Sequence, residues 1–157
     1  MLSSIGVKGS IIGHFERRQF GETFKLINKK IKSLIDNNLT SIVCIGETSE
    51  EKIIKDIILE NQIDECLNGI VDNKNVIIAY EPIWAIGKDK SISISDINSS
   101  ISVIREKCKK INLNNVKILY GGSVNSNNVD EILSFENIDG VLIGRASLDP
   151  HFMRKLI

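Results

Sequence analysis

The sequence has few features that would separate two domains or insert the chain into a membrane. It contains only two prolines, and no proline-rich or glycine-rich linker separates one segment from another. No apolar run approaches the roughly 20 residues that a membrane-spanning helix needs. The first residues lack the basic and apolar regions of a secretory signal peptide. With 157 residues, the chain is predicted to form one domain, residues 1–157.

Neither sign of charge predominates, and cysteine is scarce. Twenty basic residues balance 20 acidic ones, so the sequence lacks the basic surface of a nucleic-acid-binding protein. The three cysteines, Cys44, Cys66 and Cys108, are odd in number, far apart and without the spacing of a metal site. We therefore expect buried, reduced thiols in a cytoplasmic protein, with no metal, no nucleic-acid partner and no membrane association.

The sequence does contain a regular alternation of two patterns. Short β-branched runs, apolar on both faces, are typical of buried parallel strands. They occur at residues 11–12, 41–45, 76–80, 116–120 and 141–143. Longer segments between them repeat apolar residues every three or four positions, as the buried face of a helix does. Alternation of this kind predicts an α/β fold with a parallel sheet, either open and doubly wound or closed into a barrel.

Three apolar stripes predict the helices between these strands. Ser93 with Asp96, and Thr48 with Glu51, have the spacing of a capping box at a helix start. The stripes are Ile27, Ile31, Leu34 and Ile35; then Ile54, Ile57, Ile58, Cys66, Leu67 and Ile70; and then Ile97, Ile101, Ile104, Cys108 and Ile111.

The functional face of a parallel α/β fold lies at the carboxyl ends of its strands. The loops after the last two predicted strands, residues 120–123 ("YGGS") and 144–147 ("GRAS"), are rich in small residues. Backbone N–H groups in such turns can converge on an anion. Either loop alone is more typical of a simple tight turn, but two at consecutive strand ends favour a phosphate site.

Two titratable residues follow strands at the same edge. His14 comes shortly after the first predicted strand, and Glu81 directly follows the third. Taken singly, the histidine is more typical of a structural residue and the glutamate of a solvated or salt-bridged one. Together, beside a phosphate site, they favour an acid–base pair. A carboxylate can remove a proton next to a carbonyl group, and an imidazole can polarise the carbonyl oxygen.

The stretch after Glu81 is stiff and mostly apolar, and it contains Trp84, the only tryptophan. A stiff segment between two hinges is typical of a lid that excludes water from a reactive intermediate. The alternative for Trp84 is ordinary packing of a large side chain. The predicted lid comprises Pro82, Ile83, Trp84, Ala85, Ile86, Gly87, Lys88, Asp89 and Lys90.

Five motifs occur in the order found in one enzyme family. IIGHFERR, NLTSIVCIGET, AYEPIWAIG, ILYGGSV and IDGVLIGRASLDP closely resemble the second part of triosephosphate isomerase, and the resemblance extends from Met1 to Ile157. It implies a (β/α)8 TIM barrel, here a partial barrel containing about strands 4–8. It also implies a cytoplasmic, homodimeric isomerase of glycolysis and gluconeogenesis that uses no cofactor. Members of the family interconvert dihydroxyacetone phosphate and D-glyceraldehyde 3-phosphate through an enediolate.

The resemblance also assigns roles to individual residues. Glu81 resembles the family's proton-abstracting base, and His14 resembles its neutral electrophile. Cys44 resembles a buried cysteine near the base, which we interpret as packing. Backbone N–H groups hold the substrate phosphate in the family, and they correspond to those of Gly87, Ser123, Gly144 and Arg145.

The sequence departs from the family's pattern in several places. Family barrels have about 250 residues, so we expect the first three strands, with their catalytic lysine, to be absent and the chain alone to be weakly active or inactive. Phe15 replaces a serine that binds the base in the open state. Lys88-Asp89 replaces Thr-Gly in the lid. Arg145 replaces a glycine of the phosphate loop, where its guanidinium either adds a phosphate contact or crowds the site.

Other functions stay open at this point. The main alternative is a non-catalytic fragment that binds a complementary N-terminal half or another partner, because a partial barrel has open strand edges. A different phosphate-handling barrel enzyme is disfavoured by the Glu81 and His14 motifs.

Overall fold

The computed structural model describes residues 3–71, 74–86 and 92–156, and its centre is a parallel sheet of five strands. Strands that follow each other in the chain are neighbours in the sheet, so its order is β1-β2-β3-β4-β5. In a doubly wound sheet, the order of the strands across the sheet reverses at one point. In a barrel, strands that follow each other in the chain stay neighbours all the way round. The alternation is therefore that of a partial barrel. The strands are β1 (Gly9–Ile12), β2 (Thr40–Ile45), β3 (Val76–Tyr80), β4 (Lys117–Tyr120) and β5 (Gly140–Val141).

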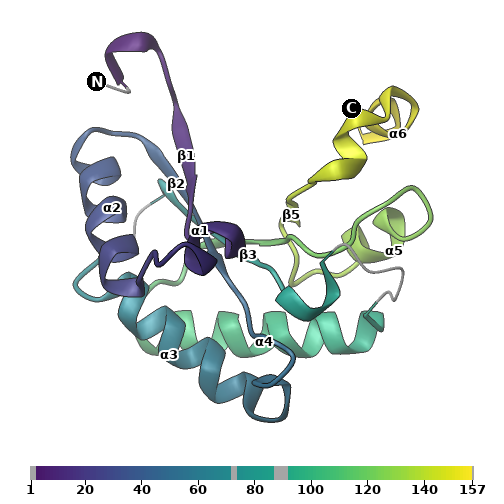
Figure 1. The fold of residues 1–157 in the computed structure, drawn as a ribbon, viewed down its shortest axis with the longest axis horizontal. Coiled ribbons are helices and arrows are strands. Elements are labelled where there is room, and N and C mark those ends of the chain that lie inside the picture. Colours follow the sequence, from purple (N-terminus) through teal and green to yellow (C-terminus); the bar gives the residue numbers. More distant parts are fainter. Residues whose placement is uncertain (1–2, 72–73, 87–91, 157) are drawn as a thin grey trace.

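The longer helices cover one face of this sheet, and the two ends of the chain, beyond β1 and β5, lie apart from each other on the opposite side (Figure 1). The α-helices are α1 (Phe15–Gln19), α2 (Phe24–Asp36), α3 (Lys55–Leu67), α4 (Ile94–Lys110), α5 (Val129–Leu133) and α6 (Pro150–Leu156). Short 3-10 turns are η1 (Ser3–Ile5), η2 (Lys52–Ile54), η3 (Ile83–Ala85) and η4 (Arg145–Leu148). Helix α3 packs between α2 and α4. None of the helices formed by the described residues combines the length and the hydrophobicity that a membrane span requires.

Of the two predicted capping pairs, one marks the start of a helix. The Ser93 hydroxyl oxygen accepts a hydrogen bond from the backbone N–H of Asp96 at 3.1 Å, which confirms the predicted start of α4. The Thr48 and Glu51 pair behaves differently. The Glu51 carboxylate accepts the Thr48 N–H at 2.8 Å, but α3 begins only at Lys55. This pair therefore shapes the loop after β2 and does not start the helix.

The first and third apolar stripes lie in the core as predicted, and Ile27, Ile31 and Ile101 are fully buried. The second stripe is wrong at its start, because Ile54 and Ile57 are 49% and 59% exposed. Ile54 ends the 3-10 turn η2, so the predicted stripe ran across a change of helical register. The buried face of α3 is instead formed by Leu59, Gln62, Ile63, Cys66 and Leu67.

The fifth strand is also shorter than predicted. It ends at Val141, and the two residues that follow, Leu142 and Ile143, belong to the loop. Strand β5 lies at an edge, where within the described residues only β4 pairs with it, so little holds a longer ladder together. The three cysteines are free and buried, as predicted.

Candidate active site

A cavity of about 750 Å³ lies at the carboxyl ends of the strands. It brings together His14 from the loop after β1, Glu81 from the end of β3, Ser123 from the loop after β4, and Gly144 with Arg145 after β5. These are five of the six predicted catalytic and phosphate-binding residues. The sixth, Gly87, lies outside the described residues, and so do the predicted lid residues Lys88, Asp89 and Lys90.

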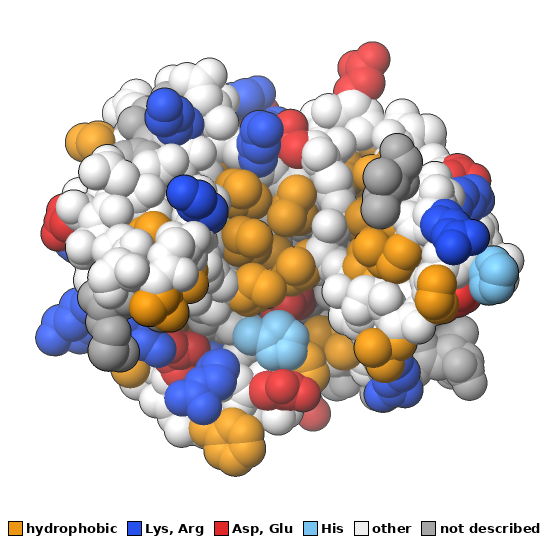
Figure 2. Space-filling model, turned by 90° about the horizontal axis from the view of Figure 1, so that it is seen from above, with side chains coloured by type: hydrophobic (Ala, Val, Ile, Leu, Met, Phe, Trp, Pro, Cys, Tyr) orange, Lys and Arg blue, Asp and Glu red, His pale blue; other side chains and the backbone are white. Residues whose placement is uncertain are grey.

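The cavity has an apolar side as well as a polar one. Its walls include Ile11, Leu142 and Ile143, and hydrophobic side chains gather in a hollow at the centre of the molecule (Figure 2). Ile11 is 50% exposed, whereas Ile12, which points to the opposite face of β1, is only 6% exposed. In a closed barrel, the Ile11 side chain would be covered.

Glu81 lies at the polar side of the cavity with its side chain only 2% exposed. One carboxylate oxygen, Oε1, is 3.6 Å from Nε2 of His14. The other, Oε2, is buried and has no hydrogen-bond partner among the described residues. Burial raises the pKa of Glu81, although the nearby His14, Cys44 and Arg18 groups oppose that rise. A raised pKa makes the ionised carboxylate a stronger proton acceptor.

His14 occupies the position just before helix α1, and its imidazole is 35% exposed. Nδ1 lies 3.7 Å from Oε2 of Glu16, and Nε2 lies near Glu81. Both distances are longer than a hydrogen bond. The ring also packs against Phe15, with 4.6 Å between the ring centroids. The imidazole therefore lies between two carboxylates and borders the cavity.

The backbone of Glu81 is held against the end of β2. Its N–H donates to the Ile45 carbonyl at 2.7 Å, and a side chain at Gly46 would lie 1.8 Å from the Glu81 carbonyl oxygen. Gly46 is held in turn from two sides. Its N–H donates to the Gln62 side chain at 2.8 Å, and its carbonyl accepts from the Arg18 guanidinium at 3.1 Å.

Arg18 lies beside the site, next to Gly46 and Glu81, although no role was predicted for it. Burial lowers the pKa of its guanidinium, while the charge of Glu81 acts in the opposite direction. Its Nε and Nη2 atoms are buried without a hydrogen-bond partner among the described residues. The available signal was its place in the GHFERR motif that follows the first predicted strand. Arg18 lies in helix α1, which directly follows His14, and its guanidinium reaches the end of the neighbouring strand β2 at Gly46.

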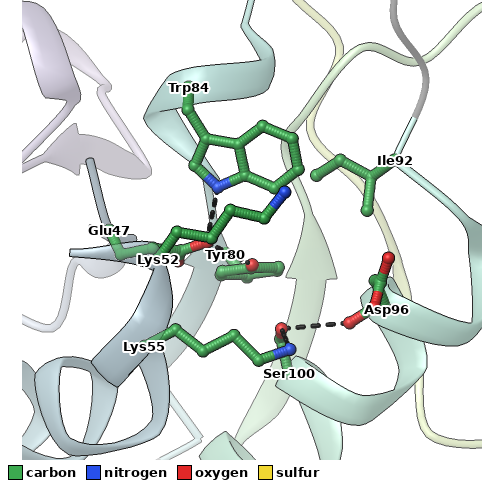
Figure 3. Close-up of a pocket in the computed structure, with 8 residues that line it drawn as sticks. All are labelled: Glu47, Lys52, Lys55, Tyr80, Trp84, Ile92, Asp96 and Ser100. Atoms are coloured by element: carbon green, nitrogen blue, oxygen red, sulfur yellow. Dashed lines mark hydrogen bonds between the residues drawn. The ribbon is translucent and has the colours of Figure 1, made fainter. Parts of the chain in front are cut away.

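Trp84 is held by a hydrogen bond to Glu47, in a second cavity of about 200 Å³ (Figure 3). The indole N–H donates to Glu47 Oε1 at 2.7 Å, and the Tyr80 hydroxyl donates to the same oxygen at 3.1 Å. Glu47 is fully buried, and burial raises the pKa of Tyr80, which keeps its hydroxyl protonated. The sequence did not single out Glu47, because its partners come from a different strand.

A further contact joins the segment after Glu81 to the loop after β4. The Ser123 hydroxyl donates to the Ala85 carbonyl at 2.8 Å. Gly122 in the same loop allows no side chain, since an added Cβ would lie 2.2 Å from the Tyr120 hydroxyl oxygen. The described part of the predicted lid, residues 82–86, is thus tied to both neighbouring strand-end loops.

Fold and site together define an α/β chain of partial-barrel type with a histidine and a glutamate at its strand ends. The chain belongs to the triosephosphate isomerase family, whose family model matches residues 1–157.

Three relatives, each named triosephosphate isomerase, illustrate the similarity. The protein of Prochlorococcus marinus strain NATL1A is 46% identical over 153 residues, which cover 96% of this chain and 61% of the relative. The protein of Synechococcus sp. strain JA-3-3Ab is 41% identical over 160 residues, which cover 100% of this chain and 61% of the relative. The protein of Mycoplasmoides gallisepticum is 45% identical over 165 residues, which cover 99% of this chain and 66% of the relative. The chain therefore spans about three fifths to two thirds of these relatives' length.

Proposed function

We propose that this chain provides the proton-transfer groups of a triosephosphate isomerase active site. The observation that carries the proposal is the 3.6 Å contact between Glu81 and His14, in a cavity shared with Ser123, Gly144 and Arg145. The substrates are dihydroxyacetone phosphate and D-glyceraldehyde 3-phosphate, as the family's name implies.

The proposed reaction moves one proton between adjacent carbons. The Glu81 carboxylate removes a proton from C1 of dihydroxyacetone phosphate, which leaves an enediolate, and returns it at C2. His14 polarises the substrate's carbonyl oxygen through Nε2 and stabilises the negative charge that develops there. It also passes a proton from the oxygen on C1 to the oxygen on C2, so that the ketone becomes the aldehyde. The backbone N–H groups of Ser123, Gly144 and Arg145 hold the phosphate, and the N–H of Gly87 completes this set. The lid of residues 82–90 excludes water from the intermediate.

We further propose that the 157-residue chain alone turns over slowly. Strands β1 and β5 each pair on one side only within the described part of the chain, and Ile11 is half exposed. Electrostatic stabilisation of an intermediate depends on fixed groups in a site that excludes water. An open cavity neither holds these groups completely fixed nor excludes water completely. In addition, the family's catalytic lysine has no counterpart among the motifs of this chain.

A second function is favoured by the same open surface. A non-catalytic chain would bind a complementary N-terminal half, which would cover Ile11 and pair with the free edges of β1 and β5. The single-domain organisation, cytoplasmic location and homodimeric assembly of the family are proposed for this chain on similarity alone.

A coupled isomerase assay separates these functions. The purified chain should show a low rate that disappears in Glu81→Asp, because the shorter side chain withdraws the carboxylate from the substrate. A rate equal to that of a full-length relative would contradict slow turnover by the isolated chain. A rate unchanged by Glu81→Asp would contradict the role of the base. No rate alone, but activity when the N-terminal part of the Prochlorococcus marinus relative is added, would favour the complementing fragment.

A further inference from the structure

We propose that Lys52 is a positioning residue that holds the Trp84 indole against Glu47. Lys52 lies in the 3-10 turn η2 after β2, whereas Trp84 lies in η3 after β3. The Lys52 ammonium is 3.7 Å from the centroid of the indole ring. The role of this clamp in turnover rests on the proposed function, but the clamp itself does not.

The indole is placed between a cation and an anion. Figure 3 shows the Lys52 side chain extending beside the Trp84 ring, whose N–H points to Glu47. A cation over an aromatic face attracts the ring's electrons. That polarisation makes the indole N–H a stronger donor to the carboxylate, since neighbouring interactions in a chain reinforce one another. Lys52 and Glu47 therefore stabilise the same position of the ring.

The environment of Glu47 explains why a nearby cation matters. The side chain is fully buried, and both of its donors, from Trp84 and Tyr80, bond to Oε1. Oε2 has no hydrogen-bond partner among the described residues, and no ion pair of Glu47 is found there. A buried carboxylate that lacks partners is costly. Lys52 places a positive charge over the face of the indole ring whose N–H binds Glu47. This charge stabilises the indole in the position where it donates to the carboxylate.

A second lysine in the same cavity serves a different purpose. Lys55 also lines the space around Glu47 and Asp96. Its ammonium donates to the Ser100 hydroxyl at 3.1 Å, which ties the start of α3 to α4. Two lysines three residues apart thus line one cavity, but only Lys52 contacts the ring. Lys55 is the matched control.

The position of Trp84 has a direct link to the proposed base. Trp84 lies three residues after Glu81, within the described part of the predicted lid. Lys52 therefore helps to set the path of the chain as it leaves the base. In an active protein, loss of this clamp should change kcat and KM together, as hinge substitutions often do.

The inference can be tested without any turnover, because Trp84 is the only tryptophan in the chain. Its fluorescence and its single indole N–H resonance report on this ring alone. Exposed cation–π contacts contribute about 0.5–1 kcal/mol, so Lys52→Met should accelerate hydrogen exchange of the indole N–H about two- to fivefold. Quenching of Trp84 by acrylamide should increase in the same variant. Lys52→Arg should restore both values, and Lys55→Met should leave them unchanged.

Lys52→Gln repeats the test without exposing an apolar side chain, and far-UV circular dichroism checks that each variant is folded. Wild-type exchange and quenching in both Lys52→Met and Lys52→Gln would overturn the inference. An equal effect of Lys55→Met would also overturn it, since the ring would then respond to the charge of the cavity in general. Absence of isomerase activity bears on the proposed function alone and leaves these readouts intact.

Discussion

Gly46 is the point where the loop after β2 passes closest to the backbone of Glu81. In Gly46→Ala, the added Cβ would lie 1.8 Å from the Glu81 carbonyl oxygen and 2.5 Å from its carbonyl carbon. Ordinary contacts begin at 3.4 Å, so the two segments must separate by about 1.6 Å. Gly46 cannot withdraw freely, because Gln62 and Arg18 hold its N–H and its carbonyl.

The expected cost follows from this geometry. Overpacking a tight site costs about 1–3 kcal/mol, and losing one of the Gly46 hydrogen bonds adds about 1 kcal/mol. We therefore expect the free energy of unfolding to fall by about 2–4 kcal/mol. In an active protein, displacement of the base by about 1 Å can reduce the rate about 100-fold.

Urea unfolding followed by far-UV circular dichroism measures the stability change. Lys25→Ala is the control, since Lys25 is exposed on helix α2. Its free energy of unfolding should change by no more than about 0.5 kcal/mol. If Gly46→Ala proved as stable as the control, the close approach of the Gly46 and Glu81 backbones would be refuted.

Three further predictions concern the charges around the site. Because burial raises the pKa of Glu81 above its ordinary value of 4.5, the folded protein binds this proton more tightly than the unfolded chain. The free energy of unfolding should therefore fall as the pH rises from 4.5 through the raised pKa, and Glu81→Gln should remove that fall. Urea titrations at several pH values measure this fall in the free energy of unfolding. The same pH dependence in the wild type and in Glu81→Gln would contradict the prediction. Arg18→Met should raise the pKa of Glu81 further, because the guanidinium charge lowers it; carbon NMR of the labelled carboxylate would show no shift if the two groups were independent. Trp84→Phe leaves buried Glu47 without one donor and should cost about 1–3 kcal/mol of unfolding free energy, whereas a variant of unchanged stability would mean that the Glu47 contact contributes little.

The sequence predicted those elements whose pattern depends only on burial. Strand β3 matches the predicted range because a strand buried on both faces is a continuous apolar run. The stripe of α4 is confirmed for the same reason, since Ile97, Ile101 and Ile104 all face the core. His14 and Glu81 were predicted to share one site, because the ends of parallel strands meet at one edge.

Other features depend on geometry that a linear pattern does not contain. The 3-10 turn before α3 shifts the helical register, so Ile57 faces solvent despite its spacing. The contact of Glu47 with Trp84 joins residues 37 positions apart, and it requires the loops after β2 and β3 to be in place first. Arg18 reaches Gly46 across 28 positions for the same reason.

Proton exchange in D2O tests the central claim most directly. Dihydroxyacetone phosphate is incubated with the purified 157-residue chain, and proton NMR measures deuterium incorporation at C1, which detects slow turnover. The account predicts incorporation above the buffer rate, and its loss in Glu81→Gln, which keeps the shape of the side chain but cannot accept the proton. Incorporation that persists in Glu81→Gln, or none above buffer with the folded wild-type chain, would contradict Glu81 as the base of a working site.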